Sequence, residues 1–457
     1  MNRIASRSWV LILLVLLLVA GLVFFVYEFA LEAEKWVLFQ GSPHIYEGDN
    51  VGRGVVTDRT GILLLDMRQG RIYSDSDPLR MSTVHWLGDR YGSINAPAIS
   101  HYVSQMAGYN AFNGVYTYGQ NGGIAEMTLY SQVQTAALAA MGDYKGTVAV
   151  YNYKTGEILC AVTTPSYDPD NVPDISLDTA GSYEGIYVNR FIQSAYTPGS
   201  IYKIVTLAAA LECIEDIENQ RFVCAGSYTI GSDTITCEGA HWEQDLKTAF
   251  CNSCNCAFAQ IAEQLGSENL NRYVAQFGII KPLSFDGITT GEGNFDLSKA
   301  YGIDVAWSAI GQYTDLVNPC RFMTFLGAIA AGGQGVEPHL INKITVDGVT
   351  TYSASSVSAD RIMSVQTAKI LQQYLRNNVQ SKYGDDNFQG LTVCAKTGTG
   401  EVGGDKKPNA LLTGFVADES YPLAFICVVE DGGYGRTVCM PIVSKVLAVC
   451  KDAMDSQ

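Results

Sequence analysis

Strand and helix patterns alternate along the last two thirds of the chain. Apolar and β-branched residues indicate two strands at 147–153 and 158–163, joined by a turn. Three further strand patterns lie near 391–399, 409–417 and 422–430. Two early and three late strands, with helices between and after them, predict one five-stranded antiparallel sheet covered by helices, a mixed α/β fold of the α+β type.

Apolar residues at helical spacing mark the segments that would cover this sheet. Ile204, Leu207, Ala208 and Leu211 follow the i, i+3, i+4, i+7 pattern, so a strong helix is predicted over 200–211. The same periodicity predicts the remaining helices over 129–141, 245–265, 318–331 and 441–454.

The N-terminus holds an uncharged, apolar run over residues 9–27. Nineteen residues at ~1.5 Å each span about 28 Å, close to the ~30 Å hydrocarbon core of a bilayer. Arg3 and Arg7 precede the run and acidic residues follow it. We therefore expect residues 1–8 in the cytoplasm, a single-pass anchor over 9–27, and the rest of the chain outside the cell membrane. A cleaved signal peptide is the alternative, but the run is long for one and no convincing cleavage site follows.

Residues 28–142 would form a membrane-proximal, non-catalytic module. Its first part, 30–50, has the pattern of an extended lead-in, and two short strands around a Thr60-Gly61 turn follow it. Weak periodicity over 66–125 predicts a small irregular unit. The Tyr-rich stretch 109–118 is interpreted as packing, with contact to a partner as the alternative.

Composition and charge narrow the class of protein. Hydrophobic residues make up 47% of the 457 residues, enough for a sizeable core, which excludes a disordered tail. The formal net charge is -16 and no dense Lys/Arg patch occurs, so no nucleic-acid partner is expected. Five histidines beside twelve cysteines argue against a His-rich metal enzyme, and we predict no metal site and no cofactor.

The twelve cysteines leave two interpretations open. In an exported chain they would form disulfides, unless the protein works where thiols stay reduced. Cys251, Cys254 and Cys256 lie close together, but no second ligand pair with zinc-finger spacing accompanies them. We interpret these three as small buried side chains near a helix start rather than as a metal site.

The segment Ser200-Ile-Tyr-Lys203 carries the first candidate chemistry. On a helix, positions i and i+3 share a face, so the Lys203 amine would reach the Ser200 hydroxyl. A serine hydroxyl needs an adjacent base to become a nucleophile at neutral pH. Lys203 serves as that base only if burial or a neighbouring cation lowers its pKa.

Two further motifs follow in order along the chain. Ser253-Cys-Asn255 is an S-x-N triplet at the start of a helical stretch, and Lys396-Thr-Gly398 ends an apolar strand. Neither triplet is unique, since S-x-N recurs at 93–95 and 267–269, and K-T-G recurs at 154–156. The copy at 154–156 lies between two predicted strands, which indicates a hairpin turn.

The ordered set S-x-x-K, S-x-N and K-T-G resembles the penicillin-binding proteins and serine β-lactamases. The flanking stretches 189–203, 310–312 and 396–401 are similar to those around the same motifs in that family. Residues 53–61 resemble the membrane-proximal segment of class B penicillin-binding proteins. The likeness covers 143–457 firmly, as a transpeptidase domain, and 50–142 loosely.

One more stretch carries the resemblance. Cys224-Ala-Gly226, Cys237 and His241 are similar to the segment that precedes the second motif in this family.

This resemblance implies a peptidoglycan D,D-transpeptidase that works through a covalent acyl-enzyme. Ser200 would attack the carbonyl of a D-Ala–D-Ala stem peptide, and the amine of a neighbouring stem peptide would resolve the intermediate. Lys203 would take the Ser200 proton, and Ser253 would pass it to the leaving amine. β-Lactams would mimic the donor peptide and acylate Ser200.

The resemblance also implies a set of substrate-binding residues. Asn255 would hold the donor peptide, while Lys396 and Thr397 would bind its terminal carboxylate. Gly398 would let the donor backbone lie against the strand edge. The backbone N–H groups of Ser200 and Thr399 would form an oxyanion hole.

Three other functions remain as alternatives on the same residues. A β-lactamase or β-lactam sensor would share the fold, and a D,D-carboxypeptidase would use water in place of the acceptor amine. A non-catalytic cell-wall scaffold would carry a decayed site. A hydrolase with His241 as base is disfavoured because Pro198 replaces the glycine of a G-x-S-x-G elbow.

The length of the N-terminal module bears on partners. About 115 residues between the anchor and residue 143 are too few for an additional glycosyltransferase domain of the bifunctional class. The resemblance therefore implies a polytopic membrane glycosyltransferase of the elongation or division machinery as a partner.

Overall fold

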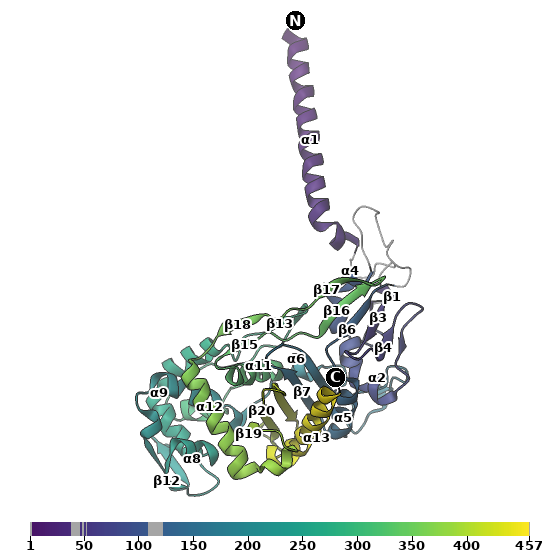
Figure 1. Cartoon of the computed structure of the whole chain (residues 1–457). Coiled ribbons are helices and arrows are strands. Elements are labelled where there is room, and N and C mark those ends of the chain that lie inside the picture. The colour runs from purple at the N-terminus through teal and green to yellow at the C-terminus, as the bar shows by residue number, and fades with distance from the viewer. Residues whose placement is uncertain (1, 38–45, 48–49, 52, 108–121, 457) are drawn as a thin grey trace.

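The structure is a computed structural model that describes residues 2–37, 46–47, 50–51, 53–107 and 122–456 of the chain (Figure 1).

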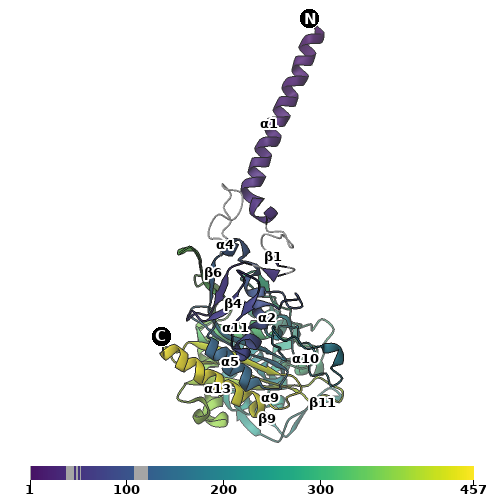
Figure 2. The same ribbon diagram turned by 90° about the vertical axis from the view of Figure 1, so that its right-hand side faces the viewer.

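Helix α1 (Asn2–Val37) lies apart from the body of the molecule in both views (Figures 1 and 2). Its segment Arg7–Glu32 is long and apolar enough to cross a membrane, and no part of that window is buried in the protein. The helix is longer than the run at 9–27, and it includes the start of the predicted extended lead-in. Leu, Ala, Glu and Lys after Tyr27 are good helix formers, which accounts for the extension.

The N-terminal module is more regular than its weak periodicity predicted. It contains a six-stranded sheet in the order β17-β16-β6-β3-β4-β5, in which β3 and β6 are parallel and the other pairs are antiparallel. The expected turn at Thr60-Gly61 joins β3 to β4. The strands are β3 (Val55–Thr57), β4 (Leu63–Asp66), β5 (Ile72–Tyr73), β6 (Ile124–Met127), β16 (Ile341–Val346) and β17 (Val349–Ser353).

Strands β16 and β17 come from late in the chain, so this sheet contains segments from both sides of residue 142. The division into a module over 28–142 and a domain over 143–457 stays a prediction. The Tyr-rich stretch 109–118 lies outside the described residues. The module also holds β1 (Tyr46–Glu47), β2 (Asn50–Val51), α2 (Asp77–Leu87), α3 (Pro97–Ser100) and α4 (Val103–Ala107).

The segment around Asp58 ties the module to the rest of the molecule. Asp58 Oδ1 accepts from Thr60 N at 2.8 Å, and its Oδ2 accepts from Ser131 N at 3.0 Å, at the start of α5 (Ser131–Met141). Arg59 pairs with Glu157 at 3.2 Å between the closest nitrogen and oxygen. This short segment is therefore a structural link between the six-stranded sheet and the rest of the molecule.

The predicted five-stranded antiparallel sheet is confirmed, in the order β19-β20-β21-β7-β8. Its copy of Lys-Thr-Gly at 154–156 forms the turn between β7 and β8, as expected. The strands are β7 (Gly146–Asn152), β8 (Ile158–Thr164), β19 (Val393–Gly400), β20 (Asn409–Val416) and β21 (Leu423–Val429).

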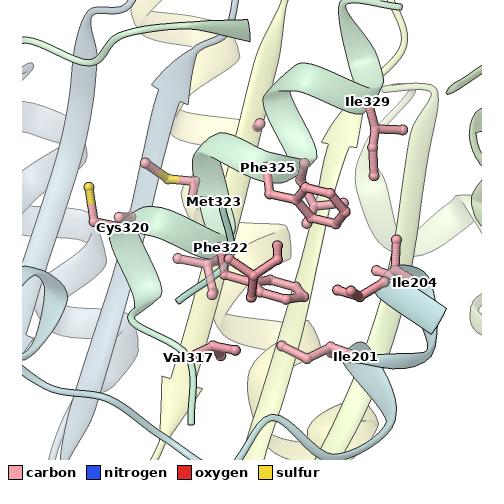
Figure 3. Packing of buried hydrophobic residues seen from close by; sticks show 14 of the residues in the cluster. Ile201, Ile204, Val317, Cys320, Phe322, Met323, Phe325 and Ile329 are labelled. Atoms are coloured by element: carbon pink, nitrogen blue, oxygen red, sulfur yellow. The ribbon is translucent and has the colours of Figure 1, made fainter. Parts of the chain in front are cut away.

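Helices cover both faces of this sheet. Side chains alternate along a strand, so Val148 and Val150 pack toward α5 (Ser131–Met141) and α13 (Gly435–Asp455). Ala149 and Tyr151 point to the other face, which α11 (Pro319–Ala330) covers, and α7 (Lys203–Cys213) belongs to the same apolar cluster. On that face, α11 packs against β20 and β21 and lies in front of the strands in Figure 3.

Figure 3 labels apolar side chains of α11 and of the segment that begins α7. They lie together over the sheet and include Ile201, Ile204, Phe322, Phe325 and Ile329.

Several predicted helices differ in their ends. The helix expected over 200–211 begins as the 3₁₀ turn η2 (Gly199–Ile201). The helix expected over 245–265 is two helices, α8 (Leu246–Cys251) and α9 (Asn255–Phe277), and the break falls on the second motif. Helix α13 begins before Pro441, so the proline lies inside it.

Further elements surround these helices. The helical ones are η1 (Ile175–Leu177), α6 (Arg190–Gln193), η3 (Ile217–Asn219), α10 (Ile303–Ala309), α12 (Val365–Asn378), the π-helix η4 (Val379–Tyr383) and η5 (Asp385–Phe388). The two-stranded pairs are β9 (Arg221–Cys224) with β12 (Trp242–Asp245), β10 (Ser227–Ile230) with β11 (Asp233–Thr236), β13 (Ser284–Phe285) with β14 (Ile288–Thr289), and β15 (Gln334–Val336) with β18 (Ser358–Arg361).

Candidate active site

Ser200 lies in η2, directly before α7 and beside strand β19. Gly199 has a φ of +52°, a conformation that favours glycine. A Cβ on Gly199 would lie 2.0 Å from the Thr399 carbonyl oxygen. The absence of a side chain at this position therefore lets the Ser200 turn pack directly against the strand that carries the third motif.

Lys203 connects the first two motifs. Its Nζ lies 3.0 Å from Ser200 Oγ, as the i, i+3 spacing predicted, and 2.7 Å from Asn255 Oδ1. It also donates to the Ser253 carbonyl oxygen at 2.6 Å and lies 3.2 Å from Ser253 Oγ. Lys203 is fully buried, whereas Ser200 is partly exposed, so a substrate reaches the hydroxyl and not the amine.

Burial supplies the pKa shift that a base at Lys203 requires. Loss of hydration lowers the pKa of Lys203 to about 8, because a buried ammonium is disfavoured. The pKa of Lys396 is also lowered, first by burial and then by the positive charge of Lys203. A neutral fraction of Lys203 is therefore available near neutral pH.

Ser253 lies between the two lysines. It occupies the break between α8 and α9 with a φ of +53°, which is rare for a residue with a side chain. Its Oγ lies 3.2 Å from Lys203 Nζ and 3.0 Å from Lys396 Nζ. A hydroxyl accepts two hydrogen bonds and donates one, so these contacts leave the Ser253 proton free to point toward a substrate.

The strand β19 forms an edge of the central sheet. It pairs with β20 on one side only, and Thr397 N–H on the other side donates to Tyr383 OH at 3.1 Å. Backbone direction alternates along a strand, so the Thr399 N–H faces the same way as that of Thr397. This edge, beside Ser200, is where an added strand would pair.

The absence of a side chain at Gly398 also has a structural reason. A Cβ there would lie 2.7 Å from the Pro198 carbonyl oxygen and 3.2 Å from Ile201 N. The missing side chain makes room for the turn that carries Ser200. The expectation that Gly398 also gives space to the substrate backbone stays a prediction.

Asn255 is already engaged by the protein. Its Oδ1 accepts from Lys203, and its Nδ2 donates to the Thr236 carbonyl oxygen at 2.9 Å. Nδ2 carries a second hydrogen, and the side chain is partly exposed, so one donor is left for a ligand. Asn255 thus positions Lys203 in addition to any role in binding.

Two residues beside β19 were not found as site residues from the sequence. Tyr383, at the end of the π-helix η4, lies 3.1 Å from Thr397 Oγ1 through its hydroxyl. Gln312 Nε2 donates to the Thr399 carbonyl oxygen at 3.3 Å. Gln312 belongs to the flank 310–312 noted above, whereas nothing in the local pattern singles out Tyr383.

The other copies of the motifs lie elsewhere. The S-x-N triplet at 267–269 is inside α9, and the K-T-G triplet at 154–156 is in a hairpin turn. His241 Nδ1 faces Cys237 Sγ at 3.5 Å, in a group of cysteines, which supports the rejection of a Ser-His base.

This group of cysteines departs from our expectation. The ligand atoms of Cys224, Cys237, His241 and Cys254 all lie within 4.8 Å of one another. We expected Cys254 to be a small buried side chain beside Cys251 and no metal site at all. Cys237 and His241 are four residues apart and were not recognised as a ligand pair, and Cys224 and Cys254 lie 13 residues before and after them.

The fold and the arrangement of the three motifs are those of the penicillin-binding class. Residues 146–448 match the family model for the penicillin-binding protein transpeptidase domain, and the chain belongs to that family.

Relatives and a solved structure agree with this assignment. The chain is 29% identical over 358 residues to stage V sporulation protein D of Bacillus subtilis, covering 73% of this chain and 54% of that protein. It is 29% identical over 339 residues to the peptidoglycan D,D-transpeptidase PbpA of Mycolicibacterium smegmatis, covering 68% of each. A ceftriaxone acyl-enzyme complex of penicillin-binding protein A from M. tuberculosis shares the fold, with a TM-score of 0.74, 24% identity, and coverage of 87% of this chain and 97% of that one.

Proposed function

We propose that this chain is a peptidoglycan D,D-transpeptidase that cross-links stem peptides through an acyl-enzyme at Ser200. The observation that carries the proposal is the position of Lys203 Nζ. It lies 3.0 Å from Ser200 Oγ and also contacts Ser253 and Asn255, below the open edge of β19. This is the arrangement that a serine nucleophile without a histidine requires.

Acylation begins with neutral Lys203. As Ser200 Oγ attacks the carbonyl of the D-Ala–D-Ala bond, its proton moves to Lys203 Nζ. Ser253 then gives its proton to the leaving amine and takes one from Lys203, with which it is in contact, and free D-Ala departs. The products are an ester at Ser200 and a neutral Lys203, so the charge of the site is restored.

The donor peptide would lie along the edge of β19. The Thr399 and Ser200 N–H groups would stabilise the oxyanion, and Thr397 Oγ1 and the second Asn255 hydrogen would hold the donor. Lys396 is buried and donates to Ser253 Oγ and to the Thr397 carbonyl oxygen at 3.0 Å each. Protonated Lys396 has three donors, so one is left for the terminal carboxylate, to which it would also supply positive charge.

Deacylation distinguishes the related activities. An acceptor amine from a neighbouring stem peptide gives transpeptidation, and water gives a D,D-carboxypeptidase side activity. β-Lactams would acylate Ser200 in the same way as the donor. A β-lactamase or sensor is the alternative, and fast nitrocefin hydrolysis would favour the former.

The setting of the enzyme is part of the proposal. Helix α1 fits a single-pass anchor, and Arg3 and Arg7 before the apolar run favour a cytoplasmic N-terminus with the catalytic domain outside. A polytopic membrane glycosyltransferase would supply the glycan strands.

A labelling experiment with the full-length chain in detergent tests the site. Fluorescent penicillin should label wild type and not Ser200→Ala, and mass spectrometry should map benzylpenicillin to the Ser200 peptide. Ser267→Ala, in the S-x-N triplet at 267–269 inside α9, is the matched control and should label like wild type. Labelling of Ser200→Ala would show that another residue is the nucleophile.

A further inference from the structure

The four residues Cys224, Cys237, His241 and Cys254 come from separate positions of the chain. Cys224 ends β9, Cys237 follows β11, His241 precedes β12, and Cys254 is the N-cap of α9. We propose that these four side chains bind one Zn²⁺ ion in a closed tetrahedral site that holds the second catalytic motif in place. Three thiolates and one imidazole are a ligand set typical of structural zinc.

The separations between ligand atoms agree with tetrahedral geometry. Zn–S bonds of about 2.3 Å place two sulfur ligands about 3.8 Å apart, and a Zn–N bond of about 2.0 Å places sulfur and nitrogen about 3.5 Å apart. Cys237 Sγ lies 3.9 Å from Cys254 Sγ and 3.5 Å from His241 Nδ1. Since no separation in the group exceeds 4.8 Å, binding requires small side-chain movements only.

Hydrogen bonds of the backbone hold the ligands in place. His241 N donates to the Cys224 carbonyl oxygen at 3.0 Å, and Cys237 N donates to that of Gly226 at 2.9 Å. The Ala257 N–H donates to Cys254 Sγ at 3.4 Å, a contact that stabilises a thiolate. Cys224 Sγ lies 3.5 Å from the Gly239 carbonyl oxygen, and the metal would replace the thiol proton that points there.

Two other interpretations explain less of this geometry. Packing as small apolar side chains would account for buried Cys224 and Cys254, but not for His241 and half-buried Cys237 beside them. A Cys237–Cys254 disulfide would need the sulfurs to move from 3.9 Å to about 2.05 Å and would leave the other two ligands unused. A single metal ion uses all four.

The position of Cys254 would let a bound metal affect the second catalytic motif. Cys254 lies between Ser253, whose backbone is in a strained conformation, and Asn255, which contacts Lys203. A metal ion bound by Cys254 and by the ligands at the ends of β9 and β11 would hold the short break between α8 and α9 in place. Cys224, Cys237 and His241 are then positioning residues for the second motif, acting through Cys254.

Metal content tests the proposal directly. The full-length chain in detergent, purified under reducing conditions and titrated with Zn²⁺, should hold about one zinc per chain by elemental analysis. Cys237→Ser and His241→Ala should lose it, while Cys251→Ser, three residues from Cys254 but outside the group, should keep it. Co²⁺ in place of zinc should give thiolate charge-transfer absorption and tetrahedral d–d bands. If Cys237→Ser does not fold, His241→Gln replaces it.

Three results would overturn the site. The first is the absence of bound zinc in wild type after titration, and the second is zinc content in His241→Ala and Cys237→Ser equal to that of Cys251→Ser. A Cys237–Cys254 disulfide in the protein as isolated, seen as a loss of two mass units and cross-linked peptides, would also replace the metal by a redox pair.

The expected effect of zinc on acylation rests on the proposed function. Acylation is therefore measured separately from zinc content. Removal of zinc by a chelator should slow acylation by fluorescent penicillin about tenfold, and added Zn²⁺ should restore it. The same treatment should leave the rate for Cys237→Ser unchanged. If wild type binds zinc but never labels, the metal site stands and the proposed function fails.

Discussion

The two Lys-Thr-Gly triplets of this chain have the same sequence but lie in different structural environments. The triplet at 396–398 runs along the edge of the central sheet, where its lysine is buried beside Ser253. The triplet at 154–156 turns between β7 and β8, where its lysine is exposed. Three residues do not specify chemistry by themselves. A site arises where the fold buries the cation and leaves the strand edge open.

Replacing the lysine of each triplet in turn should give the largest difference in acylation rate between the two triplets. In Lys396→Ala the charge beside Ser253 Oγ is lost, so penicillin acylation should fall about 10²–10³-fold. In Lys154→Ala the rate should match wild type, since that side chain is exposed and outside the site. Stopped-flow measurement of acylation on both variants checks this, and equal losses would refute it.

The pH dependence of acylation should show that a buried lysine of the site controls the rate and that the exposed Lys154 does not. Lys203 accepts a proton only when neutral, and burial lowers its pKa to about 8. The rate should therefore rise with pH through about 8 and level off above it, and at pH 6 it should be about 100-fold below the plateau. Lys154→Ala should keep this profile. A rate independent of pH between 6 and 9 would show that Lys203 is not the base.

Sequence reasoning succeeded where one segment determines its own structure. The strands of the central sheet and the spacing of Ser200 and Lys203 follow from local periodicity, because buried strands and one helical turn repeat at fixed intervals. It failed where distant segments meet. Strands β16 and β17 join the N-terminal sheet from more than 200 residues away, and no local pattern marks that pairing.

Within the site, the same limit applies to three features. The contact of Tyr383 with Thr397, the grouping of Cys254 with Cys237, and the packing of Gly398 against Pro198 all depend on tertiary structure. The break between α8 and α9 was also missed, since helical periodicity continues across it. Motif order identified the chemistry, but only the fold shows what holds each residue.

Substituting the glycine of each triplet should affect activity in one case and stability in the other. A Cβ in Gly398→Ala would meet the Pro198 carbonyl oxygen at 2.7 Å and displace the turn that carries Ser200. We expect acylation to fall about 10²-fold, because a shift of about 1 Å at a nucleophile has that effect. Rates of acylation and thermal unfolding should both be measured.

Gly156→Ala is the matched change in the other triplet. Its φ of +90° is unfavourable for alanine, and a Cβ would lie 2.2 Å from the Glu337 carbonyl oxygen. We expect a loss of about 2–3 kcal/mol in the free energy of unfolding, with acylation by the folded fraction unchanged. Lower acylation in Gly156→Ala with normal stability would contradict this division.

The smallest effects should come from the groups that support each triplet. Tyr383→Phe removes the hydroxyl that contacts Thr397 Oγ1 and accepts from Thr397 N, both at 3.1 Å. Asn152→Ala removes an oxygen that accepts from Lys154 N at 2.9 Å and from Thr155 N at 3.1 Å. One hydrogen bond contributes about 1 kcal/mol, so the first change should slow acylation about fivefold. The second should cost about 1–2 kcal/mol of stability and leave acylation unchanged. If Tyr383→Phe alters stability alone, the open edge of β19 does not need Tyr383 to hold Thr397 for the substrate, and the difference between the triplets lies in their lysines and glycines.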